Sequence, residues 1–173
     1  MARTVSIVVV AGLVTVMVFG VPAIRNPIAF FRILFTPMPD VLPVPVAGVE
    51  PERIRDSWGA PRGADRRHEG IDIFAPRGTA VKSTTRGVVA QVGQSNLGGN
   101  VVWIFGPRGS RHYYAHLDRF ADIRPGQVVS SGDTIGYVGD SGNARGGSPH
   151  LHYGIYGFGG GAMNPFPYLR SGG

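Results

Sequence analysis

The sequence contains no cysteine, which excludes disulfide bonds, zinc sites built from thiolates and cysteine nucleophiles. Charged residues are also scarce: they make up 16% of the chain, compared with ~25% in an average soluble domain. Lysine is almost absent, because Lys82 is the only lysine among 17 basic residues. The arginines lie singly apart from Arg66 and Arg67, so the net charge of +6 forms no basic groove for a nucleic acid, and no nucleic-acid partner is expected. The charge suits an anionic wall or membrane surface.

Glycine and proline, by contrast, are abundant: 27 glycines and 14 prolines make up about a quarter of the 173 residues. Such a content excludes a coiled coil or a helical bundle and favours short strands joined by tight turns. Runs rich in Val, Ile, Tyr and Trp, punctuated by glycine, predict strands. These runs lie at 81–92, 100–105, 111–117, 134–138 and 151–156, and 51–57 suits one short helical turn. The sequence therefore predicts an all-β or β-dominated domain over 49–173.

The amino-terminal region has a different composition. Residues 4–24 contain no charge and lie between Arg3 and Arg25. A helix of that length spans roughly 30 Å, the thickness of the hydrocarbon core of a membrane. We therefore predict an uncleaved signal anchor, a single transmembrane helix, over 1–26. The alternatives are a cleaved signal peptide, whose apolar region is usually about 7–15 residues long, and a buried helix of a soluble domain.

Residues 27–48 are predicted to link this segment to the domain. The stretch 27–35 is apolar around Arg32 and suits a juxtamembrane segment at the lipid headgroups. Four prolines follow within 36–48, which favours an extended and stiff spacer. The alternative is that the Val and Leu residues of this stretch pack on the edge of the domain.

All five histidines lie between His68 and His152, inside the predicted domain. The first belongs to the segment 68–72, which ends at Asp72, and imidazole and carboxylate are both zinc ligand types. In a fully extended chain the Cα atoms of His68 and Asp72 would be about 13 Å apart. That separation is too large for a shared ion, so we infer a bend near Gly70. Taken alone, the segment has a simpler interpretation as a surface histidine and a solvated aspartate.

The other histidines lie in two predicted strands. In the His-Leu-His segment at 150–152, residues two apart share a face, so both imidazoles point to one side. The same alternation puts Tyr114 and His116 on one face of the strand 111–117, together with His112. Ordinary exposed or structural histidines are the alternative in both strands. For His112 we predict an exposed side chain, with a contact at the rim of a cleft as the functional alternative.

Together the three segments resemble one family, the lysostaphin-like (LytM-type) zinc metalloendopeptidases that cut peptidoglycan cross-links. The family pattern is a His and an Asp separated by three residues, then an Ala-His-Leu strand, then a His-Leu-His strand. All three occur here in this order, and the resemblance covers about 46–169. Further matches flank them at Gly78-Thr79, Gly87-Val88-Val89, Gly126-Gln127-Val128, Ile135-Gly136 and Val138-Gly139.

The resemblance implies a small antiparallel β-sheet, open and barrel-like, and a role for each site residue. His68, Asp72 and His152 would hold one zinc ion (Zn2+) per chain, with a water in the fourth position. His116 and His150 would be catalytic histidines that do not bind the metal. One of them, His150 in the first place, would accept the proton of the water, and the other would steady the oxyanion or protonate the leaving amine.

The resemblance also implies a substrate and a location. The substrate would be the stem peptides and cross-links of peptidoglycan, with either a D-Ala to diaminopimelate bond or a glycine bridge as the bond that is cut. Because this substrate lies outside the cytoplasmic membrane, we expect the catalytic domain to face the periplasm or extracytoplasmic space from a single-pass anchor. A cleaved, secreted form is the alternative.

Two positions depart from the family pattern. Gly154 stands where many relatives carry an acidic residue, and no tyrosine lies between Gly59 and Arg67, where some relatives use one at the oxyanion. The main alternative is a non-catalytic peptidoglycan-binding or hydrolase-activating domain of the same fold, but all five expected site residues are present. A trypsin-like serine protease, suggested by 139–142, would need two barrels and a longer chain.

Overall fold

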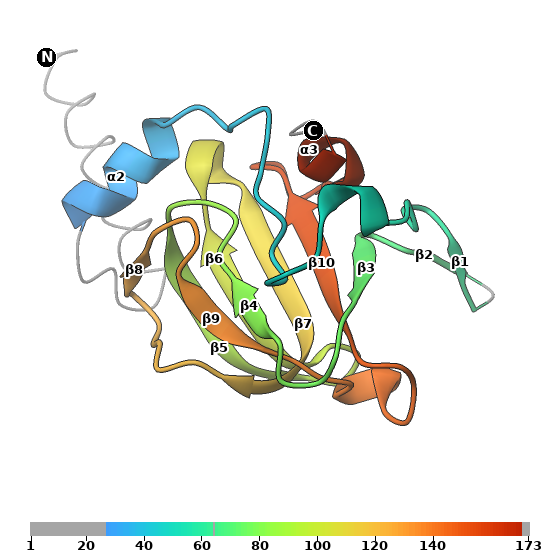
Figure 1. Ribbon diagram of the computed structural model, residues 1–173. Helices are drawn as coiled ribbons and strands as arrows, with labels where there is room; N and C mark the ends of the chain where they lie inside the picture. Colours follow the sequence, from blue (N-terminus) through green and yellow to red (C-terminus); the bar gives the residue numbers. More distant parts are fainter. Residues whose placement is uncertain (1–26, 64, 171–173) are drawn as a thin grey trace, which may run out of the picture.

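An antiparallel sheet dominates the computed structural model, which describes residues 27–63 and 65–170 (Figure 1). Within these residues nine strands form one sheet, and two more form a separate hairpin. The strands are β1 (Pro61–Arg62), β2 (Arg66–Arg67), β3 (Ile71–Phe74), β4 (Ala80–Lys82), β5 (Gly87–Ser95), β6 (Gly99–Phe105), β7 (Arg111–Phe120), β8 (Val128–Val129), β9 (Thr134–Val138), β10 (His150–Tyr156) and β11 (Ala162–Met163). The helices are α2 (Pro27–Phe35) and α3 (Phe166–Arg170), with 3-10 turns η1 (Pro51–Arg53), η2 (Pro107–Gly109) and η3 (Gly142–Ala144). The predicted β-dominated fold is confirmed.

The sheet is open and branched. Its main path runs β11-β10-β7-β6-β5-β8, while β3 pairs with β10, β9 pairs with β7 and β4 pairs with β9. Every pairing is antiparallel. Among the described strands no pairing closes this path into a barrel.

One predicted strand is wrong as a single element, because 81–92 is divided between β4 and β5. The segment between them turns away from the sheet and carries three buried hydroxyl residues, Ser83, Thr84 and Thr85. Hydrogen bonds inside the protein satisfy two of these hydroxyls: Ser83 Oγ donates to the carbonyl oxygen of Thr85 at 2.7 Å, and Thr84 Oγ1 lies 2.8 Å from Tyr153 Oη. Burial of the Ser83 and Thr84 hydroxyls is tolerated because they keep hydrogen-bond partners, whereas Thr85 Oγ1 is buried without one among the described residues.

The core occupies one face of β3 and β10, and the opposite face of both strands is left for polar residues. In β10, Leu151, Tyr153 and Ile155 are fully buried, whereas His150, His152 and Tyr156 are half-buried. In β3, Ile71 and Ile73 are likewise buried. Because side chains alternate across a strand, the residues between these core positions point to the other side of the sheet.

The region before the predicted domain packs on it. Helix α2 places Phe30 and Ile33 against Val88 of β5, and the Phe30 ring stacks on Phe105 at a centroid distance of 4.7 Å. Within 36–48, Leu42 and Val46 belong to the main core, so the alternative in which this stretch packs on the domain is the right one. No helix among the described residues is long and apolar enough to cross a membrane. The predicted anchor at 1–26 lies outside those residues.

Candidate active site

A bend brings two of the candidate ligands together. His68 lies before β3 and Asp72 lies within it, and the chain bends at Gly70 between them. As a result His68 Nε2 is 3.1 Å from Asp72 Oδ1, and the inferred bend is confirmed. Position 70 requires glycine, because a Cβ atom there would lie 2.6 Å from the carbonyl oxygen of Tyr153 and 2.7 Å from Cε1 of His152.

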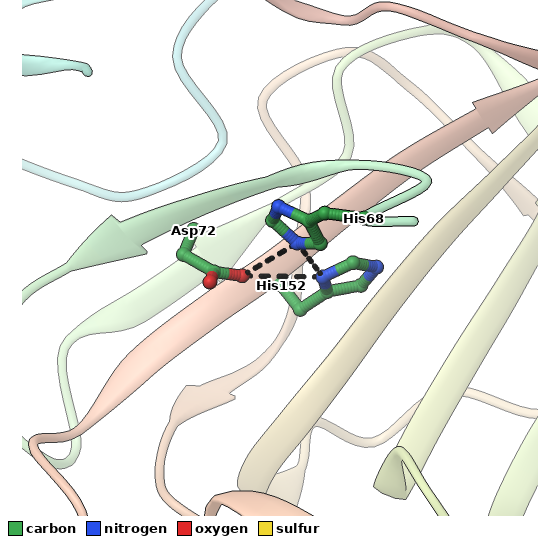
Figure 2. A group of neighbouring side chains, drawn as sticks. All are labelled: His68, Asp72 and His152. Carbon is green, nitrogen blue, oxygen red and sulfur yellow. Dashed lines mark hydrogen bonds and ion pairs between the residues drawn. The ribbon is translucent and has the colours of Figure 1, made fainter. Parts of the chain in front are cut away.

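His152 completes a triangle of ligand atoms (Figure 2). The register of β3 and β10 places His152 directly opposite Asp72. Nδ1 of His152 lies 2.8 Å from Nε2 of His68 and 3.2 Å from Oδ1 of Asp72. In tetrahedral zinc with ligands at 2.0–2.1 Å, neighbouring ligand atoms lie about 3.3 Å apart. The observed spacing therefore suits three ligands of one metal ion.

Neighbouring groups fix the orientation of these ligands. Nδ1 of His68 lies 2.7 Å from the carbonyl oxygen of Ser57. Because a carbonyl only accepts, Nδ1 carries the proton and Nε2 presents its lone pair to the site. The backbone N–H of Asp72 donates to Ser57 Oγ at 3.1 Å, and the Arg62 guanidinium pairs with Asp72 Oδ2. Such partners are typical of metal ligands, so the residues fit a His-Asp-His metal centre.

The protonation of the cluster also suits a metal. Burial raises the pKa of Asp72, but the neighbouring side chains of His152, His68 and Arg62 outweigh burial and hold this pKa well below its usual range. Burial lowers the pKa of His152, although the Asp72 carboxylate opposes the shift. The aspartate is therefore ionised and His152 neutral near pH 7, which are the states that bind metal ions.

Two further imidazoles flank the triangle. The ring centroids of His116 and His150 are 5.0 Å apart, and those of His116 and His152 are 5.9 Å apart. Each flanking ring has its Nδ1 bound to a carbonyl oxygen, His116 to Ser141 at 2.9 Å and His150 to Ser148 at 2.8 Å. Both therefore carry the proton on Nδ1 and leave Nε2 as an acceptor. Burial lowers the pKa of His116 to about 4, so this ring is neutral near pH 7.

The structure corrects the predicted facing of β7. Tyr114 is fully buried in the core, whereas His116 lies in the site, so the two do not share a face. A bulge opposite Val101 inserts an extra residue into β7, and His116 takes a positive φ of 62° there. The bulge breaks the alternation of side chains and turns His116 towards the candidate metal ligands.

The prediction of an exposed His112 is wrong. Its ring is fully buried, with Nδ1 2.8 Å from Tyr153 Oη and Nε2 3.0 Å from Ser110 Oγ. Burial lowers the pKa of His112 to about 3. His112 is thus a core residue on the far side of the sheet from the metal ligands.

The site opens into a cleft of about 660 Å³ with an aromatic wall. The Trp103 ring lies 4.3 Å from Tyr113 and 5.4 Å from Tyr156, measured between centroids. Arginines of the β1–β2 hairpin line another part of the cleft, as do Leu97 and Asn143. This wall is not predictable from the sequence, because its residues come from three strands whose pairing is not visible there.

A His-Asp-His cluster that fits a metal ion, open on one side to a cleft and flanked by two further imidazoles on an antiparallel sheet, points to a class: the metal-dependent hydrolases. Comparison with known proteins narrows the class, since the model of peptidase family M23 matches residues 66–165. The chain belongs to peptidase family M23, a family of metallopeptidases, as the resemblance implied.

Individual relatives agree with this assignment. The chain is 44% identical over 128 residues to the L-Ala–D-Glu endopeptidase of Bacillus subtilis (strain 168). The aligned residues cover 68% of this chain and 39% of that relative. It is 38% identical over 94 residues to the peptidoglycan DD-endopeptidase ShyC of Vibrio cholerae, over 53% of this chain and 20% of ShyC. The catalytic domain of lysostaphin from Staphylococcus simulans superposes with a TM-score of 0.61 and 30% identity, over 70% of this chain and 96% of that domain. The chain thus spans well under half the length of the two full-length relatives.

Proposed function

We propose that the chain is a zinc-dependent endopeptidase that hydrolyses peptide bonds of peptidoglycan. The observation that carries the proposal is the convergence of His68 Nε2, Asp72 Oδ1 and His152 Nδ1 within 3.2 Å of one another, beside the imidazoles of His116 and His150. Two histidines and a carboxylate form a donor set that zinc prefers.

The mechanism assigns each residue a task. His68, Asp72 and His152 would hold the zinc, which when bound supplies a Lewis acid and an activated water. His150 Nε2 would accept the proton of the attacking water. This atom is the acceptor of the ring, because Nδ1 carries the proton and donates it to the carbonyl oxygen of Ser148. His116, fixed by Ser141 in the same way, steadies negative charge on the substrate oxygen or passes a proton to the leaving amine.

The names of the relatives support peptidoglycan as the substrate class. One relative is named for an L-Ala–D-Glu bond and another for a DD-peptide bond. Because these bonds differ, we propose the stem peptides and cross-links as the substrate rather than one bond. The open cleft with an aromatic wall gives such a peptide access to the metal ligands.

The location is part of the proposal. Peptidoglycan lies outside the cytoplasmic membrane, and residues 4–24 are uncharged and long enough to span it. We infer a single-pass anchor over 1–26 with the catalytic domain on the outer side. Mature protein that starts near Met1 and fractionates with membranes is the expected result, and a soluble species that starts near residue 24 would establish cleavage instead.

The test of the activity combines metal analysis with wall digestion. Protein prepared in metal-free buffer is loaded with zinc, its zinc content is measured, and it is incubated with purified wall material. The expected result is about one zinc per chain, new amine ends in the digest, and loss of hydrolysis with a chelator that zinc reverses. Full hydrolysis by verified metal-free protein would overturn zinc dependence. Bound zinc without new amine ends would favour the non-catalytic alternative.

A further inference from the structure

A second surface of the molecule combines exposed apolar side chains with positive charge. It is formed by helix α2, the turn η2 and the turn between β10 and β11. Its most exposed members are Phe35, Phe158 and Ile28, with exposed fractions of 79%, 70% and 69%. Leu34, Phe35, Pro37, Arg108 and Phe158 line a shallow hollow of about 460 Å³ there. We call these residues, with Ile28 and Arg32, the end patch.

The sequence of α2 indicates that a second surface must cover it. Eight of its nine residues are apolar or proline, and Arg32 is the exception. One side of the helix packs on the domain through Ala29, Phe30 and Ile33, while Ile28 and Phe35 face outwards. A helix that is apolar on nearly all sides is normally covered on nearly all sides.

The charge of the end patch indicates which kind of surface covers it. The three segments that build the end patch, 27–38, 105–111 and 156–163, contain Arg32, Arg108 and Arg111 and no Asp or Glu. Aromatic and aliphatic side chains interspersed with arginine suit the interface of an anionic lipid membrane. The position in the chain agrees, because the uncharged stretch 4–24 ends three residues before α2 begins.

The end patch lies far from the catalytic histidines. Phe158 lies just beyond the end of β10, and Arg108 lies just before the start of β7. His150, by contrast, is the first residue of β10, and His116 lies five residues into β7. At about 3.3 Å per residue, roughly 20 Å of strand separates His150 from the patch end of β10. Figure 1 shows the same arrangement: α2 lies at the top left, and the orange loop that leads into β10 lies at the bottom.

We propose that the end patch docks on the outer surface of an anionic lipid membrane and holds the metal end of the cleft pointing away from it, towards the wall. The inference rests on the proposed outward-facing anchor. Because α2 and residues 36–48 already pack on the domain, docking fixes the orientation of the whole domain. The reach of the enzyme is then set by the length of the domain.

The absence of cysteine makes a clean test possible. Single-cysteine variants Phe158→Cys and Phe35→Cys of the full chain are labelled with a polarity-sensitive fluorophore and reconstituted into phosphatidylglycerol-containing vesicles. Phe74→Cys is the matched control, because Phe74 is 62% exposed and its ring lies 5.1 Å from His150, at the other end of the domain. We expect the labels at 158 and 35 to shift to the blue and to be quenched by lipids that carry a nitroxide at the headgroup. The label at 74 should show neither effect.

Charge removal tests the choice of lipid. Arg32→Gln and Arg108→Asn should each weaken docking on the order of fivefold. Asparagine is chosen at position 108 because residue 108 has a positive φ of 53°, which asparagine tolerates. Equal quenching in neutral phosphatidylcholine vesicles would overturn an anionic partner. A label at 158 that behaves like the label at 74 would overturn docking, and a blue shift without lipid quenching would show that protein covers the patch. Sedimentation with vesicles tests the anchor separately, and cleavage of a soluble stem peptide by the same samples tests the activity.

Discussion

His116 has a backbone conformation that residues other than glycine rarely adopt, with φ at 62°. Such a conformation costs about 1–3 kcal/mol, and it persists only when surrounding contacts determine it. Here the N–H of His116 donates to the carbonyl oxygen of Gly98 at 2.8 Å, and its ring Nδ1 is bound to Ser141. The strain thus coincides with a side chain that faces the proposed metal ligands, which supports a task in the proposed reaction rather than in folding.

Substitution of the two histidines of β10 should separate metal binding from proton transfer. His152→Ala should lose both zinc and activity, because Nδ1 of His152 belongs to the ligand triangle. His150→Ala should keep near-stoichiometric zinc but lose activity by about 100- to 10,000-fold, the usual contribution of a positioned base. Zinc content and turnover are measured side by side. If His150→Ala loses zinc as fully as His152→Ala, His150 is a ligand and His116 becomes the candidate base.

Arg62 should set the affinity of the metal centre. Its guanidinium pairs with Asp72 Oδ2 and thereby leaves Oδ1 to face the two histidines. Repulsion between Arg62 and the ion is weakened by solvent, since the Arg62 side chain is 44% exposed. The loss of orientation should dominate, and Arg62→Ala should weaken zinc binding by about 10- to 100-fold.

The measurement for Arg62 is a competition with a chromophoric chelator. Arg66→Ala is the control, because Arg66 lies on the same hairpin and its side chain makes no hydrogen bond or ion pair with the described residues. Equal zinc affinity in the wild type and Arg62→Ala would show that the pairing with Asp72 has no bearing on the metal.

At the scale of the elements, single strands are predictable from the sequence, whereas the pairing between strands is not. The strand 134–138 and the alternation of 150–152 follow from residue type and period, and both are found. The bulge in β7 depends on which strand lies beside it, so the face of His116 was predicted wrongly. His112 was placed at the surface because nothing in its own strand shows that Thr84 and Tyr153 meet it in the core. The candidate site residues are implied by the family resemblance of three short segments, which the sequence alone displays, whereas the cleft wall arises only from the assembled sheet.

The bend before β3 makes Gly70 a sensitive position. Gly70→Ala would force a Cβ atom against the backbone of Tyr153 and the ring of His152, so His152 must move. We expect weaker zinc binding and reduced activity, with a domain that still folds because β3 and β10 keep their pairing. Gly159→Ala is the control, since a Cβ atom there meets nothing within 4 Å. Zinc affinity of the two variants is compared, and an unchanged value for Gly70→Ala would contradict the close approach.

On the scale of the whole molecule, a buried polar cluster joins three parts of the chain. His112 of β7, Tyr153 of β10 and Thr84 of the segment after β4 are mutually hydrogen bonded, and all three are almost fully buried. An ionised histidine has no place in such a cluster, because burial disfavours its charged form. The cluster therefore links the stability of the domain to pH.

Acid should destabilise the domain through His112. Its pKa is about 3 in the folded chain and about 6.5 when unfolded. Between those values only the unfolded chain binds the proton, so the free energy of unfolding falls by about 1.4 kcal/mol for each pH unit lost. Above pH 6.5 neither state binds it and the contribution is constant. Urea unfolding at pH 4.5, 5.5 and 7 should give a shallower pH slope for His112→Gln than for the wild type; parallel slopes would contradict this.

The pairing of β3 with β10 has a consequence for biosynthesis. Asp72 and His152 are 80 positions apart and meet only when the next-to-last strand of the sheet has been laid down. Contacts so distant in sequence form late, because the closure of a long loop precedes them. A chain interrupted anywhere before residue 150 therefore has no complete centre, and a chain that is still being synthesised or threaded through a channel is harmless to whatever peptides surround it. The candidate metal site therefore forms in one step, once β10 has been delivered and pairs with β3.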